Sequence, residues 1–333
     1  MDSAQTHPLF WNERWCLAAL DRRDFQRAGL ISLMIGLGFV LFHLQGNTAD
    51  VSAFGRSVLA WMYVRWADSS ASFSSTDYSH GFLIPLVSLG VVWYRRHDLA
   101  RAEKYVSWIG LTMLIGALLL HWLGAKSQHP RLSLFAVIGI LWSVPFYLYG
   151  WNVAKILMFP CAYLVFCVPL NFLDSLTFPL QMIMIKSAST LLNGLGLEVE
   201  AVGTSMTIVS SGANFDVAAP CSGLRSLLAM TALTAVYAFV TQPDLLRKWV
   251  LFFCSIPLAI AGNIARIISI VIVAEIAGTK FALETYHDWS GYVVFAVAIG
   301  LMVSLGGMLH SHPKDLWIKW KSNLYGHTLP SSS

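Results

Sequence analysis

Long runs of apolar residues limit what this chain of 333 residues can fold into more than any other feature does. Several runs reach or exceed the roughly 18 residues that a helix needs to cross a hydrocarbon core about 30 Å thick. Hydrophobic residues make up 56% of the chain and charged residues only 12%, whereas about a quarter of the residues of soluble domains are charged. We therefore expect an all-α polytopic membrane protein.

The lengths of the apolar runs predict about eight transmembrane helices joined by mostly short loops. The predicted spans are residues 28–45, 81–94, 106–124, 132–149, 153–170, 222–240, 249–275 and 290–309. Charged residues precede the first run, which predicts a retained anchor rather than a cleaved signal peptide. The predicted organisation is a cytoplasmic N-terminal segment at 1–27, a single transmembrane domain at 28–309 with an outer cap at about 171–220, and a cytoplasmic tail at 310–333.

The basic residues predict the side of the membrane on which each loop lies, because cytoplasmic loops carry an excess of lysine and arginine. With a cytoplasmic N-terminus, fourteen of the 22 basic residues fall inside, six fall outside, and Arg225 and Arg266 fall within spans. The six outer residues are Arg56, Arg65, Lys126, Arg131, Lys186 and Lys280. This excess favours two cytoplasmic termini. The net charge of +4 is too small and too scattered to indicate nucleic acid as a partner.

The outer cap contains two different patterns. Residues 172–195 mix apolar and polar side chains in a way that predicts an interfacial helix, which Pro179 should bend or break. Residues 196–218 alternate in polarity and contain β-branched residues around Gly203, which predicts a small β-hairpin outside the bilayer. We expect this cap to face the substrate.

Cys221 lies where the polar cap meets the next predicted span. Pro220 suits the first turn of a helix, so the sequence predicts that Cys221 occupies a helix N-terminus, where free N–H groups stabilise a thiolate. Arg225 follows four residues later, on the same helix face, and adds a positive charge. Both features favour a reactive nucleophile. The alternative is a structural cysteine at a helix start, followed by an arginine that extends to the interface.

Arg266 lies inside the apolar run 249–275, where a charged side chain costs about 2.5–3.5 kcal/mol at the centre of a membrane helix. Counting along the helix places it in the outer half of the membrane, at the predicted depth of Cys221. Asn263 precedes it by three residues and shares its face, where it can orient a substrate carbonyl or the guanidinium group. A structural salt bridge between Arg266 and Glu275 is the alternative.

His287 lies at the outer edge of the last predicted span and can transfer protons near neutral pH. A single interfacial histidine is often inert. Here, however, Cys221, Arg266 and His287 come from three spans and reach the same predicted depth, so together they can supply a nucleophile, an oxyanion stabiliser and an acid or base. We see no cluster of metal ligands and expect no cofactor, and Cys161, Cys167 and Cys254 lie in apolar runs as packing residues.

Residues 78 to 295 resemble the exosortase/archaeosortase family of membrane-embedded sorting enzymes. The resemblance rests on Tyr78-Ser79-His80-Gly81-Phe82-Leu83, Val168-Pro169-Leu170, Pro220-Cys221-Ser222-Gly223-Leu224-Arg225-Ser226, Asn263-Ile264-Ala265-Arg266, and His287 with Gly291. It implies that Cys221, Arg266 and His287 are catalytic. It also implies a bacterial inner-membrane enzyme whose active site faces outward, and substrates that are exported proteins ending in a short motif, a hydrophobic helix and a basic cluster, of the PEP-CTERM type.

The expected reaction is attack by Cys221 on a peptide carbonyl, a thioester, and transfer to an unknown acceptor nucleophile or to water. Arg225, Asn263 and His80 are candidate supporting residues, although Tyr78-Ser79-His80-Gly81 also resembles a helix start capped by Ser79. A transporter or a scaffold that binds membrane lipid is the alternative function. In that case Arg225 and Arg266 would bind an anionic group and Cys221 would be dispensable.

Overall fold

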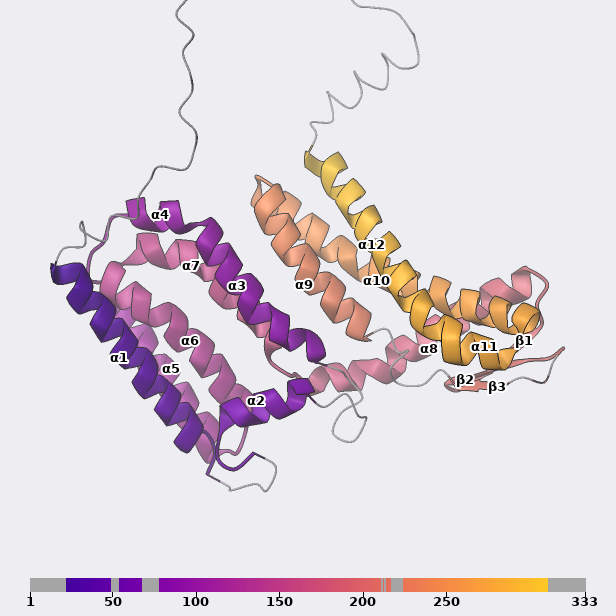
Figure 1. Ribbon diagram of the computed structural model, residues 1–333, viewed down its shortest axis with the longest axis horizontal. Coiled ribbons are helices and arrows are strands. Elements are labelled where there is room, and N and C mark those ends of the chain that lie inside the picture. The colour runs from indigo at the N-terminus through magenta and orange to yellow at the C-terminus, as the bar shows by residue number, and fades with distance from the viewer. Residues whose placement is uncertain are drawn as a thin grey trace, which may run out of the picture. The chain divides into compact units, whose positions relative to one another are not determined.

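The computed structural model describes residues 22–48, 54–67, 78–210, 212, 214–216 and 224–310, most of them in helices (Figure 1). The chain divides into two compact units, and each is described by itself. Unit 1 comprises Met1–Trp61 and Arg95–Cys161, and unit 2 comprises Met62–Tyr94 and Ala162–Ser333.

Unit 1 is built on two antiparallel helices, α5 (Trp108–Lys126) and α6 (Pro130–Tyr149), with α1 (Arg22–Leu44) packed against α6. The short helix α4 (Arg96–Arg101) precedes α5, while α2 (Val58–Ala67) and α7 (Trp151–Tyr163) begin in this unit. The pair α5 and α6 is close because two glycines of α5, Gly110 and Gly124, face the backbone of α6 with no space for a side chain.

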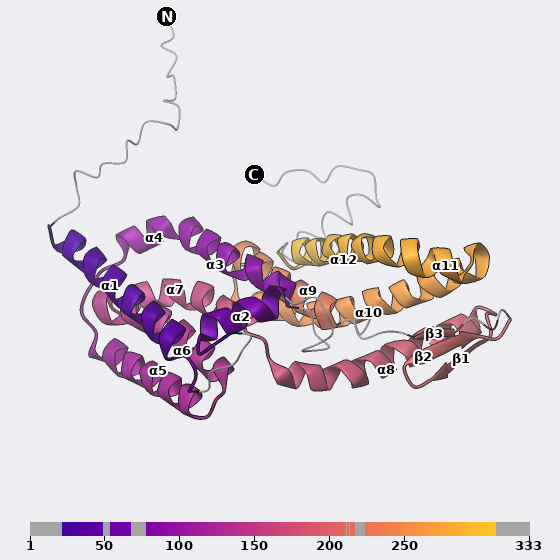
Figure 2. The same ribbon diagram turned by 60° about the horizontal axis from the view of Figure 1, so that its bottom comes forward.

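In unit 2 the helices α9 (Leu224–Thr241), α10 (Leu245–Ala277) and α12 (His287–His310) pack against one another, and Figure 2 shows α10 and α12 side by side. Its other helices are η2 (Ser79–Phe82), α3 (Leu83–Tyr94), η3 (Leu164–Cys167), α8 (Asn171–Gly194), α11 (Thr279–Phe281) and the π-helical turn η5 (Ala282–Tyr286). Of the two outcomes predicted for Pro179, a bend or a break, the break is wrong, since α8 continues through that residue.

The predicted hairpin is present, and a third strand extends it. Strands β1 (Val199–Val202) and β2 (Ser205–Ile208) pair antiparallel across Gly203, whose φ of 62° suits a tight turn. Strand β3 (Asn214–Asp216) then pairs with β2 in the order β1-β2-β3. A three-residue strand has too few residues for its alternation to be read from the sequence.

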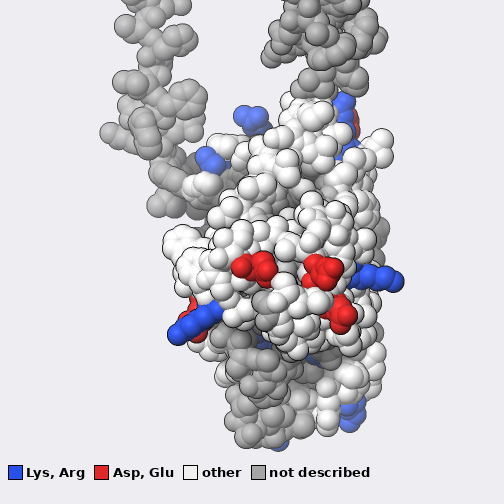
Figure 3. Space-filling view, turned by 90° about the vertical axis from the view of Figure 1, so that its right-hand side faces the viewer, with Lys and Arg blue, Asp and Glu red and all other residues white. Residues whose placement is uncertain are grey.

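Two apolar clusters hold unit 2 together along α10. The bundle core joins α9, the first half of α10 and α12 through Met230, Ala238, Leu251, Ala259, Ala298 and Met302. The cap core joins the last third of α10 to α8, the sheet and η5 through Met184, Ile185, Ala188, Leu192, Val199, Met206, Ile208, Ile267, Ile270, Val271, Ala274 and Ala282. Figure 3 views the cap end of unit 2, where charged side chains are scattered among mostly uncharged atoms.

The protein is a multi-pass membrane protein, but the described residues contain five rather than eight helices that are long and apolar enough to span a bilayer. These five are Trp108–Lys126, Pro130–Tyr149, Leu224–Thr241, Leu245–Ala277 and Trp289–His310. The other three predicted spans are shorter apolar segments, Ala28–Leu44, Ser79–Tyr94 and Trp151–Cys167. The last two each include a 3₁₀ turn, η2 or η3, which shortens the regular α-helix below spanning length.

We predict that α5 tolerates an added methyl group at Gly116 but not at Gly110. A Cβ atom at Gly110 would collide with the backbone of Tyr147, whereas one at Gly116 would meet nothing within 4 Å. Gly110→Ala should therefore destabilise the protein by about 1–3 kcal/mol, and Gly116→Ala should not destabilise it, because alanine favours helix more than glycine does. Thermal unfolding of the purified protein in detergent measures both, and equal midpoints would contradict the close packing of α5 on α6.

Candidate functional site

A layer of polar side chains separates the bundle core from the cap core on α10. Asn263 and Arg266 lie between Ala259 of the bundle core and Ile267 of the cap core. Asn263 is buried, with 7% of its side chain exposed, and Arg266 is half-buried. Both point toward neighbouring helices that carry polar groups. Such a layer is costly in an apolar bundle unless its members bind one another.

Arg266 binds to the start of α12. Its Nη2 atom donates to the backbone oxygen of His287 at 2.8 Å, and its Nε atom donates to Ser290 Oγ at 3.4 Å. Ser290 Oγ in turn donates to the same oxygen of His287 at 2.9 Å. Within the described part of the chain, no acceptor lies within hydrogen-bond distance of Nη1. The guanidinium group is therefore fixed in place and keeps donors for a further group.

His287 is brought to Arg266, as its predicted depth required. Its Nε2 atom lies 3.4 Å from Arg266 Nη2. Because a guanidinium group only donates, Nε2 can take part in this contact only as an acceptor, which requires a neutral ring with its proton on Nδ1. The helix before His287 is the π-helical turn η5, and such turns occur frequently at functional sites because they redirect side chains.

Asn263 connects this layer to the start of α9. Its Nδ2 atom donates to Ser226 Oγ at 2.7 Å and to the backbone oxygen of Ala259 at 2.9 Å. Ser226 lies in the first turn of α9, five residues after Cys221. The chain that follows Cys221 is thus joined to α10 one helical turn away from Arg266.

Glycines leave room for the layer. A small cavity of about 40 Å³ is bordered by Ser226, Asn263, Arg266 and Gly291, which is enough for a few water molecules. A Cβ atom at Gly291 would lie 3.2 Å from Arg266 Cζ and Nη2, which is tighter than an ordinary contact, so a larger residue there would require the guanidinium group to shift. The close approach of Arg266 therefore favours glycine at position 291.

The other predicted site residues have different outcomes. Cys221 and Pro220 lie outside the described residues, so the catalytic role of Cys221 stays a prediction. Arg225 is exposed on α9, next to Ser226, which faces α10. The alternative salt bridge between Arg266 and Glu275 is not formed, since Glu275 accepts from Ser210 Oγ at 2.9 Å and Arg266 binds His287 and Ser290.

His80 lies half-buried in η2, with its ring centroid 5.9 Å from that of Tyr78. Tyr78 itself is buried and fixed to Leu170, since its Oη atom donates to the Leu170 oxygen at 3.2 Å and accepts from the Leu170 nitrogen at 3.1 Å. The prediction that Ser79 caps this helix is wrong. Tyr78 holds the cap position, without a capping side-chain bond, and Ser79 is the first residue of the turn.

Sequence reasoning missed Ser226, Ser290 and the π-helical turn. Both serines are small polar residues on apolar helices, and each faces a neighbouring helix rather than lipid. A count of polar positions on the faces of α9 and α12 opposite Arg266 could have identified them. The π-helical turn has no comparable signal, because an extra residue in a helix leaves the composition unchanged.

Comparison with known families gives one match. The family model described as transmembrane exosortase (Exosortase_EpsH) matches residues 66–304, which is most of the chain. Neither the curated proteins nor the solved structures contain a match. The matched range includes the whole polar layer and leaves out α1.

We predict that the bond between Asn263 and Ser226 couples α9 to α10. Truncating both residues to alanine should cost less than the sum of the single truncations, by about 0.5–1.5 kcal/mol, because the second change removes a bond that is already lost. Ser269→Ala is the control, since among the described residues Ser269 Oγ donates only to the Arg266 oxygen of its own helix. Its effect should add to that of Asn263→Ala. Free energies of unfolding measure this cycle, and additive costs for Asn263 and Ser226 would contradict the coupling.

Proposed function

The chain belongs to the transmembrane exosortase family, and from this premise we propose that it cleaves the C-terminal sorting signal of exported proteins by cysteine catalysis at the outer membrane face. The observation that carries the proposal is the contact between Arg266 and His287, with Asn263 linking both to the start of α9. An arginine and a histidine converge there, one helical turn from the segment that follows Cys221. The substrate signal is of the PEP-CTERM type, with a short motif, a hydrophobic helix and a basic cluster.

The first step is attack by the thiolate of Cys221 on the carbonyl carbon of the scissile peptide bond. A sulfur–carbon bond forms, the carbonyl oxygen becomes an oxyanion, and the carbon–nitrogen bond then breaks to leave a thioester. Arg225 supports this step by adding positive charge to the first turn of α9, where a thiolate is stabilised. The hydrophobic helix of the substrate leaves as the free amine.

Arg266 is suited to stabilise the oxyanion. Its Nε and Nη2 atoms are occupied by α12, which holds the planar group still, while the described residues leave Nη1 without an acceptor. A donor that is already oriented stabilises developing charge without reorganising, which is the main source of oxyanion stabilisation in enzymes. Asn263 supports Arg266 by fixing the adjoining turn of α10 and can itself donate to a substrate carbonyl.

His287 is suited to move protons. A neutral imidazole with its proton on Nδ1 can take the thiol proton at Nε2 once that atom leaves its contact with Arg266, and it can then deliver the proton to the leaving amine. In the second step it removes a proton from the acceptor, an amine, a hydroxyl or water, whose attack releases the thioester. His80 is a candidate for substrate binding from the start of the α3 segment.

The proposed location is a bacterial inner membrane with both termini in the cytoplasm. The support for this orientation is the distribution of basic residues. The five helices of spanning length support a multi-pass membrane protein and do not by themselves set the side of either terminus. In this orientation α10 runs outward from Leu245, and Arg266 lies about 32 Å along it, at the outer boundary of a hydrocarbon core about 30 Å thick. The polar layer would then meet a peptide bond just outside the bilayer.

We predict that Cys221→Ser abolishes processing of a tagged substrate in cells. A serine hydroxyl is a far weaker nucleophile than a thiolate at neutral pH, so product should fall to background. Cys254→Ser is the matched control, because Cys254 is a half-buried residue of α10 outside the polar layer, and it should retain activity. Full processing by Cys221→Ser would contradict the proposal of cysteine catalysis. It would favour a transporter or scaffold that binds an anion through Arg225 and Arg266.

We also predict that substitutions of Arg266 and of His287 change the activity in different ways. Arg266→Lys keeps the charge but loses the fork that binds His287 and Ser290, so activity should fall at least tenfold with an unchanged pH profile. His287→Ala should lower activity and flatten one limb of the pH–rate curve, because histidine is the side chain that titrates between pH 5 and 8.

Trapping the acyl-enzyme separates the two roles further. His287→Ala should accumulate a substrate adduct on Cys221, visible as a band shift that hydroxylamine reverses, whereas Arg266→Ala should form none. Gly300→Ala, on the same helix with nothing within 4 Å of the added Cβ, is the control and should behave as wild type. Full activity and an unchanged pH profile in His287→Ala would remove His287 from the mechanism.

A further inference from the structure

Unit 1 contains a polar cavity that the proposed reaction does not use. It lies at the C-terminal ends of α1 and α5, beside the segment that leads to α2, and has a volume of about 530 Å³. Two basic side chains, Arg56 and Lys126, lie on its wall and are exposed. None of the described residues that line it is acidic, so the cavity is suited to an anion.

Two buried polar groups of the same cavity lack hydrogen-bond partners. Asn47 is 7% exposed and His121 is 5% exposed. Neither Asn47 Oδ1 nor His121 Nδ1 meets a partner among the described residues. A buried polar atom without a partner costs about 1–3 kcal/mol, and native structures rarely leave one unless a water or a ligand completes it. The cavity is therefore built to receive a polar group.

The rest of the cavity wall is apolar. Leu44 and Trp122 line it and are 59% and 62% exposed, and Leu41 and Leu118 complete this side. A small hydrophilic anion would make no favourable contact with these apolar side chains. An amphiphile, with a charged head and an apolar body, satisfies both halves of the cavity at once.

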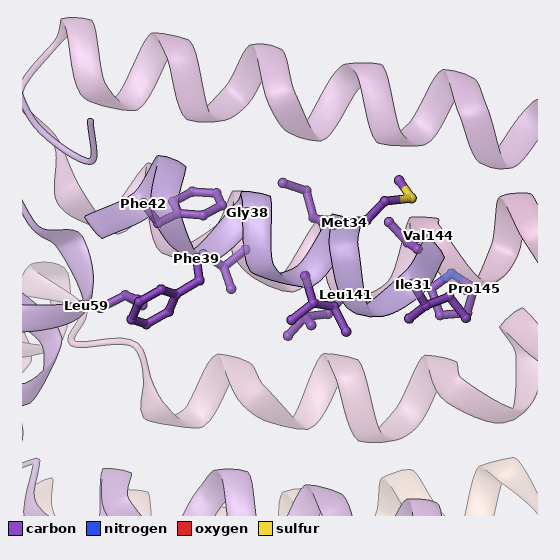
Figure 4. A pocket seen from close by; sticks show the side chains of 12 residues that line it. Ile31, Met34, Gly38, Phe39, Phe42, Leu59, Leu141, Val144 and Pro145 are labelled. Atoms are coloured by element: carbon purple, nitrogen blue, oxygen red, sulfur yellow. The ribbon is translucent and has the colours of Figure 1, made fainter. Parts of the chain in front are cut away.

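An apolar groove begins next to this cavity. It has a volume of about 180 Å³ and lies between α1 and α6, with Leu59 of α2 at its edge. Figure 4 shows its side chains running along α1 from Ile31 at one end to Phe42 at the other. This distance is about 16 Å along the helix. The Phe42 ring also packs edge-on against His121, with centroids 4.2 Å apart, so the groove ends at the cavity.

We infer that unit 1 binds one phospholipid, with the phosphate in the cavity beside Arg56 and Lys126 and an acyl chain in the groove. The phosphate accepts from the two cations, and a head-group hydroxyl or ammonium donates to Asn47 Oδ1. Basic side chains at a membrane surface attract anionic lipid. The site does not depend on the proposed function, because it shares no residue with the polar layer. Asn47 and Arg56 also lie outside the range that the family model matches, whereas His121 and Lys126 lie inside it.

The test uses the purified full-length protein in detergent, titrated with phosphatidylglycerol and followed by native mass spectrometry. The double variant Arg56→Ala/Lys126→Ala should raise the Kd at least about tenfold, because each basic residue near a membrane surface contributes to binding anionic lipid. The matched control is Lys186→Ala/Lys280→Ala, which removes two exposed lysines of unit 2 and the same charge. It should leave the Kd unchanged.

A matched pair of substitutions tests the groove. Gly38 lines it and Gly36 does not, and a Cβ atom at either would meet nothing within 4 Å. Gly38→Trp should fill the groove and weaken phosphatidylglycerol binding severalfold, whereas Gly36→Trp should not. Because these changes point into open space or lipid, they leave the packing of the helices intact.

Two further probes separate the possible ligands. Diacylglycerol with the same chains lacks the phosphate and should bind at least tenfold more weakly than phosphatidylglycerol. Equal binding of the two, or equal losses in the two double variants, would overturn the inference. If sn-glycerol 3-phosphate competes with the lipid, and Gly38→Trp has no effect, then the occupant is a soluble phosphate ester and the assignment to a lipid is wrong.

Discussion

A guanidinium group that lies inside an apolar helix bundle must be given hydrogen-bond acceptors, and much of unit 2 follows from how Arg266 receives them. The acceptors are the backbone oxygen of His287 and the hydroxyl of Ser290, both on the first turn of α12. Gly291 leaves space for the guanidinium group beside this helix, since a Cβ atom there would lie 3.2 Å from Arg266 Cζ and Nη2. The π-helical turn η5 ends directly before His287, the first residue of α12. The start of α12 therefore both places the histidine and supplies the acceptors that Arg266 needs.

The length of α10 explains why the cap is needed. A helix of 33 residues is about 50 Å long, whereas a hydrocarbon core is about 30 Å thick. The excess must be covered, because Ile267, Ile270 and Val271 lie in its last third and are apolar. Helix α8 and the small sheet supply that cover. In this way the polar layer with Arg266 and Asn263 lies between two packed apolar cores, the bundle core and the cap core.

The sequence was sufficient to predict the helical class, the helix and hairpin that follow residue 171, and that Arg266 and His287 lie at similar depth, because depth along a straight helix follows from counting residues. It did not predict Ser226 or Ser290 as partners, since the direction in which a helix faces its neighbours depends on how the helices pack. The count of eight spans is not confirmed for a related reason. Length and composition cannot show that 3₁₀ turns shorten the segments ending at Tyr94 and Cys167. Cys221, which carries the chemistry in the proposal, lies outside the described residues and stays a prediction.

The contact between Arg266 and His287 also bears on the order of proton transfers in the proposed reaction. When Nε2 accepts from the guanidinium group 3.4 Å away, the ring is neutral, and Nε2 must leave this contact in order to take a proton. Once His287 has taken the thiol proton, two positive charges lie next to each other, and like charges favour the neutral form. The imidazolium ion is therefore driven to pass its proton to the leaving amine, which returns the ring to the state that Arg266 stabilises. The same pair would then be set for the second step, in which the neutral ring takes a proton from the acceptor.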